Sequence, residues 1–225
     1  MKTIKLFGLL LLIFLTACEK NSPVENDLNS TYSMINQSSS YVNLPMVSKG
    51  KGDNYGLELT LERYFYNQFY YMVTSSLYKS TYSALNGIKY NSRYDANYAA
   101  NLVIGKEFDL RSKKNQKTLA VNIKTSLLGG NRYTPINLEQ SIIEGEDVRD
   151  ESKTNESKYD DIFMANLGVT YRVNKKKVTH EVKLDIQNVT NNQAAVGSYY
   201  DSDSQKIEEY YQLSIIPNLM YILKF

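Results

Sequence analysis

Apolar and polar residues alternate with a period of two along most of the chain from Asn54 to the C-terminus. In residues 54–65, Leu57 and Leu59 fall on one face of an extended backbone and Glu58 falls on the other. Successive side chains of a β-strand point to opposite faces, so this pattern predicts strands with one apolar and one polar face. Seven such strands are expected, at residues 54–65, 69–82, 93–108, 117–132, 162–174, 178–190 and 207–225.

The expected strands are long. Each covers at least 12 residues, whereas strands of soluble sheets commonly have about 5–6 residues. A strand that crosses a bilayer at a tilt needs about 9–11 residues. We therefore predict an all-β fold of antiparallel transmembrane β-barrel strands, seven to eight in number, that are either part of a larger barrel or a small closed one.

The connections between these strands alternate between short and long. Short turns are expected at 66–68, 109–116 and 174–177, and long loops at 83–92, 133–161 and 191–206. Outer-membrane barrels have short periplasmic turns and long extracellular loops. If Phe225 ends in the periplasm, every long loop falls outside the cell. Residues 138–161 hold nine acidic and three basic residues, which is typical of a solvated loop and could also attract cations.

Tyrosine is the dominant aromatic residue. The chain has 20 Tyr, 7 Phe and no Trp, and many of the tyrosines lie near the expected strand ends. Tyrosine suits a membrane boundary because its ring is apolar and its hydroxyl is polar. A soluble β-sandwich with exposed tyrosines is the competing interpretation, which strand length and loop rhythm disfavour.

The N-terminus has the pattern of an export signal. Lys2 and Lys5 precede an apolar run at 6–15, which is too short for a bilayer crossing of about 20 residues. Leu15-Thr16-Ala17-Cys18 resembles the lipobox of bacterial lipoproteins, in which the cysteine is acylated and becomes the new N-terminus. We predict a lipoprotein-type signal at 1–17 and lipidation of Cys18; a plain signal peptide is the alternative.

Two further regions follow the signal. Residues 18–53 contain Asn, Ser, Gly and Lys with two prolines, and are expected to be a linker or loop with a short strand near 41–47. Residues 54–225 are expected to be the outer-membrane β-barrel segment. The boundary between these two regions is placed at Asn54, where regular alternation begins.

Composition narrows the function classes. A mean hydropathy of −0.43 excludes a bundle of membrane helices but not a barrel, in which half of each strand faces water. Removing residues 1–17 takes Lys+Arg from 26 to 24, equal to the 24 acidic residues. Because the mature chain would be neutral, it would have no net positive charge to attract nucleic acid.

The sequence offers few residues for catalysis or metal binding. We expect neither enzyme activity nor a cofactor or metal site. His180 is the only histidine and Cys18 the only cysteine, which excludes the common zinc sites. Glu58 and Glu62 share a strand face, but polar residues facing a barrel lumen do so routinely. Acidic residues near Asp201 could bind Ca²⁺, although their spacing is not that of an EF-hand.

The C-terminus and several other stretches carry a family resemblance. Leu219, Tyr221, Leu223 and Phe225 alternate up to a terminal phenylalanine and look like the signal read by the barrel assembly machinery. The stretches at 50–62, 129–136, 177–181, 185–191 and 216–225 resemble the C-terminal barrel of TonB-dependent receptors of the Bacteroidetes type. The resemblance covers residues 22–225.

The resemblance implies a location in the outer membrane, in contact with lipid, and allows a surface lipoprotein as a partner. Complete receptors close about 22 strands around a plug domain, through which the TonB system acts. This chain has no room for a plug, so we expect a truncated receptor segment that is not competent for transport alone. The alternatives are a small stand-alone barrel with a structural or adhesive role, in which 41–47 is an eighth strand, and a surface lipoprotein with a soluble β-domain.

Overall fold

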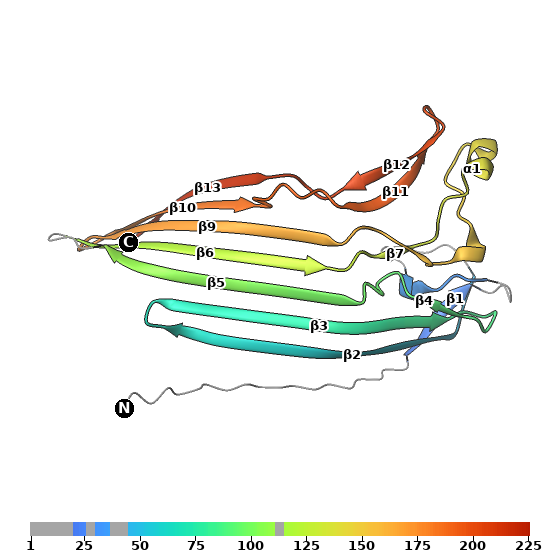
Figure 1. The fold of residues 1–225 in the computed structure, drawn as a ribbon, viewed down its shortest axis with the longest axis horizontal. Helices are drawn as coiled ribbons and strands as arrows, with labels where there is room; N and C mark the ends of the chain where they lie inside the picture. Colours follow the sequence, from blue (N-terminus) through green and yellow to red (C-terminus); the bar gives the residue numbers. More distant parts are fainter. Residues whose placement is uncertain (1–19, 26–29, 37–44, 111–114) are drawn as a thin grey trace.

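The computed structural model describes residues 20–25, 30–36, 45–110 and 115–225 (Figure 1). One nine-stranded sheet contains most of them, in the order β1-β2-β3-β5-β6-β9-β10-β13, with β4 paired to β3. All of its pairings are antiparallel, so the expected all-β, antiparallel architecture is confirmed. The strands are β1 (Lys20–Glu25), β2 (Met46–Tyr66), β3 (Phe69–Ser83), β4 (Lys89–Asn91), β5 (Tyr98–Leu110), β6 (Gln116–Leu128), β9 (Ile162–Asn174), β10 (Thr179–Gln187) and β13 (Ile216–Lys224).

Short turns lie at one end of the sheet and long connections at the other (Figure 1). The two-residue turn between β2 and β3 places Asn67 and Gln68 at φ values of 52° and 62°, the pair of left-handed conformations that a type I′ hairpin requires. The C-terminus lies at the same end as this turn, because Lys224 pairs with Thr179 at the start of β10. The expected relation between Phe225 and the short turns is therefore confirmed. We call the two ends of the sheet the turn end and the loop end.

The loop end holds small elements that the alternation does not predict. They are a 3₁₀ turn η1 (Met34–Asn36), strands β7 (Arg132–Tyr133) and β8 (Ser157–Lys158), helix α1 (Leu138–Glu144), a second 3₁₀ turn η2 (Glu151–Lys153), and the hairpin β11 (Ala195–Asp201) with β12 (Lys206–Tyr211). Within the described residues, no helix has the length and apolar character of a membrane crossing.

The last expected strand, 207–225, is divided in the structure. Its first part, β12, pairs with β11, and only β13 joins the large sheet. Asn188 ends β10 in a left-handed conformation, with φ 49°, and its side-chain amide donates to the carbonyls of Asn192 and Leu213 at 2.8 Å each. This buried amide binds the segment that follows β10 and the segment that precedes β13, and both segments leave the sheet at this level. The hairpin therefore replaces part of the expected loop 191–206.

The region 18–53 differs from the expected linker. Residues 20–25 form β1, which pairs with Met46–Gly52 at the start of β2, so β2 begins well before Asn54. The register shifts at Pro23, as suits a proline in a sheet edge, since it has no N–H to donate. Of the strand expected at 41–47, Met46 and Val47 belong to β2, and residues 41–44 lie outside the described ranges.

Candidate functional site

The register brings the apolar positions of neighbouring strands onto one side of the sheet. Tyr71 pairs with Ile104, which pairs with Ile123, and the same row continues through Leu167 to Ile186. Directly paired residues point to the same face. We call this side the apolar face; its large exposed members include Leu57, Leu59, Leu77, Ile104, Phe108, Ile123, Leu127, Tyr171, Val182, Leu184, Leu219, Tyr221 and Leu223.

The apolar face is uncovered by any described element. Ile123, in the middle of the sheet, is 47% exposed, and Leu219 near its edge is 73% exposed. The buried apolar cluster of the described residues lies instead at the loop end, around Tyr82 and Ala84. A soluble sandwich buries such a face against a second sheet, whereas here it forms a continuous surface of the kind that marks a membrane or protein contact.

The opposite side of the sheet is mainly polar, and we call it the polar face. Ser126 on β6 donates to the side-chain oxygen of Asn101 at 2.7 Å, and the Asn101 amide donates to the Thr74 hydroxyl at 3.3 Å. Three neighbouring strands are thus linked by side chains in a row. Glu58 and Glu62 lie on this face opposite Ser76 and Met72.

Aromatic and basic side chains gather at the turn end of the apolar face. The Arg63 guanidinium lies 5.8 Å from the ring centroid of Tyr66 and 5.4 Å from that of Phe69. The Lys106 ammonium lies 5.2 Å from the ring of Phe108. Long basic side chains and tyrosines with apolar stems and polar tips suit the boundary of a bilayer.

Glu181 joins three strands on the polar face at the turn end. Its carboxylate is fully buried and lies 2.8 Å from Arg172 Nε, 3.1 Å from Lys183 Nζ and 3.4 Å from Lys224 Nζ. Arg172 is on β9 and Lys224 on β13, so the buried charge ties the C-terminal strand to its neighbours. A buried carboxylate is tolerable only with such partners.

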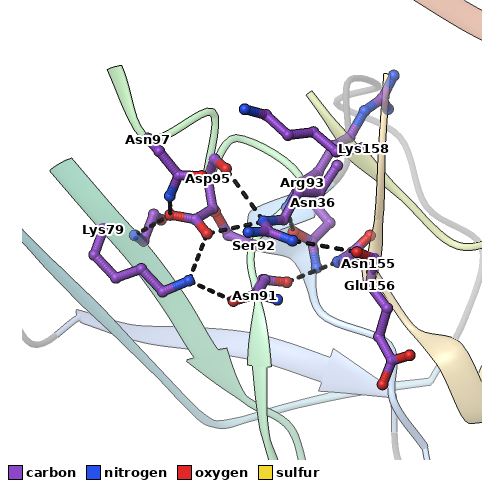
Figure 2. Close-up of polar contacts among 12 residues, drawn as sticks. Asn36, Lys79, Asn91, Ser92, Arg93, Asp95, Asn97, Asn155, Glu156 and Lys158 are labelled. Atoms are coloured by element: carbon purple, nitrogen blue, oxygen red, sulfur yellow. Dashed lines mark hydrogen bonds and ion pairs between the residues drawn. The ribbon is translucent and has the colours of Figure 1, made fainter. Parts of the chain in front are cut away.

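A second buried carboxylate, Asp95, organises the loop end (Figure 2). One of its oxygens lies 2.7 Å from Lys79 Nζ and 2.9 Å from Arg132 Nε, and its side chain is fully buried. The other oxygen accepts from the backbone N–H of Ser80 at 2.9 Å and from Asn97 at 3.1 Å. The expected strand 93–108 therefore starts only at Tyr98, because Asp95 turns inward instead of continuing the alternation.

The partners of Asp95 determine its protonation. Burial by itself would raise the pKa of this carboxyl, but the hydrogen bonds from Lys79, Ser80 and Arg132 outweigh it and hold the pKa below its usual range. The group is thus charged at neutral pH. Because Arg132 also donates to the Glu156 carbonyl at 3.3 Å, Asp95 connects the β3–β5 loop to the region between β6 and β9.

We expect Asp95→Asn to lower the free energy of local opening of residues 132–161 by about 2 kcal/mol. The substitution removes a charged hydrogen-bond acceptor from two cations. Trypsin cleavage near Arg149 would then be about 30-fold faster if it occurs from the opened state. The depressed pKa adds a pH dependence: the stabilisation is present above the unfolded pKa of about 4 and is lost as the pH falls through the lower folded value. Asp203→Asn, in an exposed loop at the same end, is the control; equal cleavage of both variants would contradict this role.

A cavity of about 560 Å³ lies between β7–β8 and the β11–β12 hairpin, and its lining includes Arg93, Tyr133, Arg149 and Tyr159. Tyr133 and Tyr159 stack at 4.0 Å between centroids. Arg149 donates to the Ser198 carbonyl at 3.0 Å, which fixes the hairpin against this region. The loop end is therefore an ordered assembly with a hollow in it.

The residues predicted from the sequence take distinct positions. Leu219, Tyr221 and Leu223 share the apolar face of β13, and Phe225 follows that strand with 97% of its surface exposed. His180 Nδ1 lies 2.7 Å from the Tyr221 hydroxyl on that face. Cys18 lies outside the described residues.

Sequence patterns did not single out Glu181 or Asp95 as buried. Each occupies a polar position in an alternating run, and only their cross-strand neighbours show that they lie out of solvent. Among the described residues, no group of three or more His, Cys, Asp and Glu side chains could hold a metal ion. Comparison of the chain with protein-family models, with curated proteins and with solved structures gives no match.

Proposed function

We propose that this chain is exported and resides in the outer membrane as the C-terminal β-barrel portion of a TonB-dependent receptor. The observation that carries the proposal is the two-faced sheet, whose apolar face has no described protein cover. Lipid would cover this face, and water would contact the polar face. Placing the turn end in the periplasm would put the long connections outside the cell.

The lengths of the strands support this proposal. β5, β6 and β9 have 13 residues each, enough for the tilted crossing that requires about 9–11 residues. The basic and aromatic residues at the turn end would then lie at the inner boundary of the bilayer. Assembly would begin with recognition of the C-terminal strand by the barrel assembly machinery.

We do not expect transport by this chain alone. Active uptake in the receptor family works through a plug domain, and the described sheet is open, with no pairing between β13 and either β1 or β2. The proposed role is therefore that of a receptor segment, with a surface lipoprotein as a further partner. A small closed barrel is the second candidate, favoured by β1, which adds an eighth strand to the path through the sheet.

Fractionation of cells that express the full chain tests the proposal. We expect the protein in the outer membrane, resistant to carbonate extraction, with the mass of a chain acylated at Cys18. A Cys18→Ala variant is the control for lipid anchoring: if the strands insert, this variant stays resistant to extraction. Release of the variant into the soluble periplasm would favour a lipoprotein with a soluble β-domain and contradict the proposal.

Deletion of Phe225 is expected to lower the amount of chain in the outer membrane at least several-fold. Phe225 is 97% exposed, so its loss should leave the thermal stability of refolded protein unchanged. A defect in assembly without a defect in stability would indicate recognition by the assembly machinery. Leu213→Ala removes another exposed apolar side chain (71%) and is the control; equal loss with both variants would argue against a specific terminal signal.

A further inference from the structure

The two ends of the apolar face differ in how their charged side chains are paired. Three lysines beside this face at the loop end each lie against a carboxylate. The pairs are Lys79 with Asp95 at 2.7 Å, Lys89 with Asp53 at 2.5 Å, and Lys158 with Asp161 at 3.5 Å. These lysines therefore have their counter-charges within the protein.

The cations on the apolar face at the turn end have no such partners. Arg63 on β2, Lys106 on β5 and Lys117 on β6 lie near the points where their strands meet the short turns. The register places all three on the apolar face. None of them forms an ion pair with a carboxylate of the described residues, and Arg63 and Lys106 lie over aromatic rings instead.

The carboxylates of the same strands point to the other side of the sheet. Glu62 directly precedes Arg63, and Glu107 directly follows Lys106. Successive side chains of a strand point to opposite faces, so the sheet separates these neighbours of opposite charge. Asp109, two positions beyond Glu107, shares the polar face with it. At the turn end, positive charge therefore lies on the apolar side and negative charge on the polar side.

The turn between β9 and β10 adds three exposed lysines, Lys175, Lys176 and Lys177, to this end. The cations border large exposed apolar side chains, among them Phe108 at 42% and Tyr221 at 60% exposure. An acidic protein would match the charges, but it would leave the apolar residues along the rest of the face uncovered. A phospholipid matches both features, because its phosphate lies at the boundary and its acyl chains lie alongside the apolar residues.

We propose that the turn end of the apolar face binds anionic phospholipids of the adjoining leaflet, with their phosphate groups on Arg63, Lys106 and Lys117. The inference rests on the proposed outer-membrane location. The phosphate of a zwitterionic lipid is balanced by the lipid's own amine, whereas an anionic lipid brings the net negative charge that these cations lack. A basic side chain near an anionic membrane surface strengthens association about fivefold. The loop end, where the lysines are paired, has no such preference.

Fluorescence quenching by brominated lipids tests the inference at each end of the face separately. The chain has no tryptophan, so one is introduced on β6 as Leu119→Trp near the turn end or as Leu127→Trp near the loop end, both on the apolar face. Protein purified from outer membranes is reconstituted in vesicles that mix phosphatidylcholine and phosphatidylglycerol, with one of the two brominated. We expect phosphatidylglycerol to be enriched about fivefold over its bulk fraction around position 119, and not around position 127.

Charge removal identifies the residues responsible. Lys106→Gln combined with Lys117→Gln should abolish the enrichment around position 119. Lys124→Gln removes a lysine from the same strand on the polar face and is the matched control, which should leave the enrichment unchanged.

Three results would overturn the inference: no enrichment around position 119, equal enrichment around position 127, or enrichment that persists in the double variant. In each of these cases the outer-membrane proposal still stands, because brominated phosphatidylcholine quenches both tryptophans. Protein that neither lipid quenches, or that is absent from the outer membrane, would refute both proposals.

Discussion

Ile123→Arg is expected to prevent stable assembly of the chain in the outer membrane. Ile123 lies in the middle strand of the apolar face, between Ile104 and Leu167, where lipid would contact it. An arginine on the lipid face near the middle of a bilayer costs about 2–4 kcal/mol. The assembled fraction should therefore fall by roughly 30-fold or more, as measured by resistance to proteolysis in outer-membrane preparations.

Ala120→Arg is the matched control for this experiment. It places the same charge on the same strand three residues away, but on the polar face, where position 120 pairs with Glu107 and Thr170. Water and the neighbouring carboxylate would accommodate the arginine, so assembly should be near normal. Equal loss in both variants would indicate that β6 tolerates no large charged residue on either face, and would remove the support for a lipid-facing side.

Glu181→Gln is expected to lower the free energy of unfolding by about 3 kcal/mol, near the lower end of the cost of breaking a buried ion pair. The substitution keeps the shape of the side chain but removes the charge that Arg172, Lys183 and Lys224 share. These cations are partly exposed, which reduces the penalty of leaving them without a counter-charge. Urea unfolding in detergent micelles, followed by far-ultraviolet circular dichroism, measures the change.

Lys224→Met removes the most exposed cation beside the Glu181 carboxylate and so measures the contribution of that cation by itself. Lys224 has 58% of its side chain exposed and lies 3.4 Å from Glu181, so its loss should cost less than about 1 kcal/mol. A larger effect from Lys224→Met than from Glu181→Gln would show that the cation, and not the shared carboxylate, holds β13 in place.

The strand positions were predictable to different degrees. Residues 162–174 form β9 with the expected bounds, because both ends of that strand coincide with a change from alternation to polar residues. The strand expected at 93–108 begins late and the one expected at 207–225 is interrupted. In both cases a single polar side chain, Asp95 or Asn188, binds backbone groups that a regular strand would have used.

β1 was missed for a related reason. Edge strands are held by backbone hydrogen bonds to a neighbour, and this requires no alternation of side chains in the strand itself. The segment Lys20–Glu25 contains a proline and has no regular pattern, so its pairing with β2 depends on where the chain returns. Among the small elements of the loop end, β7 likewise depends on a distant segment, because Arg132 and Tyr133 pair with Lys158 and Ser157, whereas α1 is bounded by its local caps, Asn137 and Gly145.

The sequence alone determined that the chain forms long antiparallel strands with one apolar and one polar face, and that short turns and Phe225 share one end. These are local properties, since period-two alternation and turn length act within a few residues of each other. Only the tertiary structure decided which side chains are buried in charge clusters, such as Asp95 and Glu181, and which strands are edges. Burial and edge position depend on cross-strand neighbours that are far apart in the chain. Strand direction alternates from one neighbour to the next, so the parallel orientation of β2 and β13 is known only once the full order of the sheet is known.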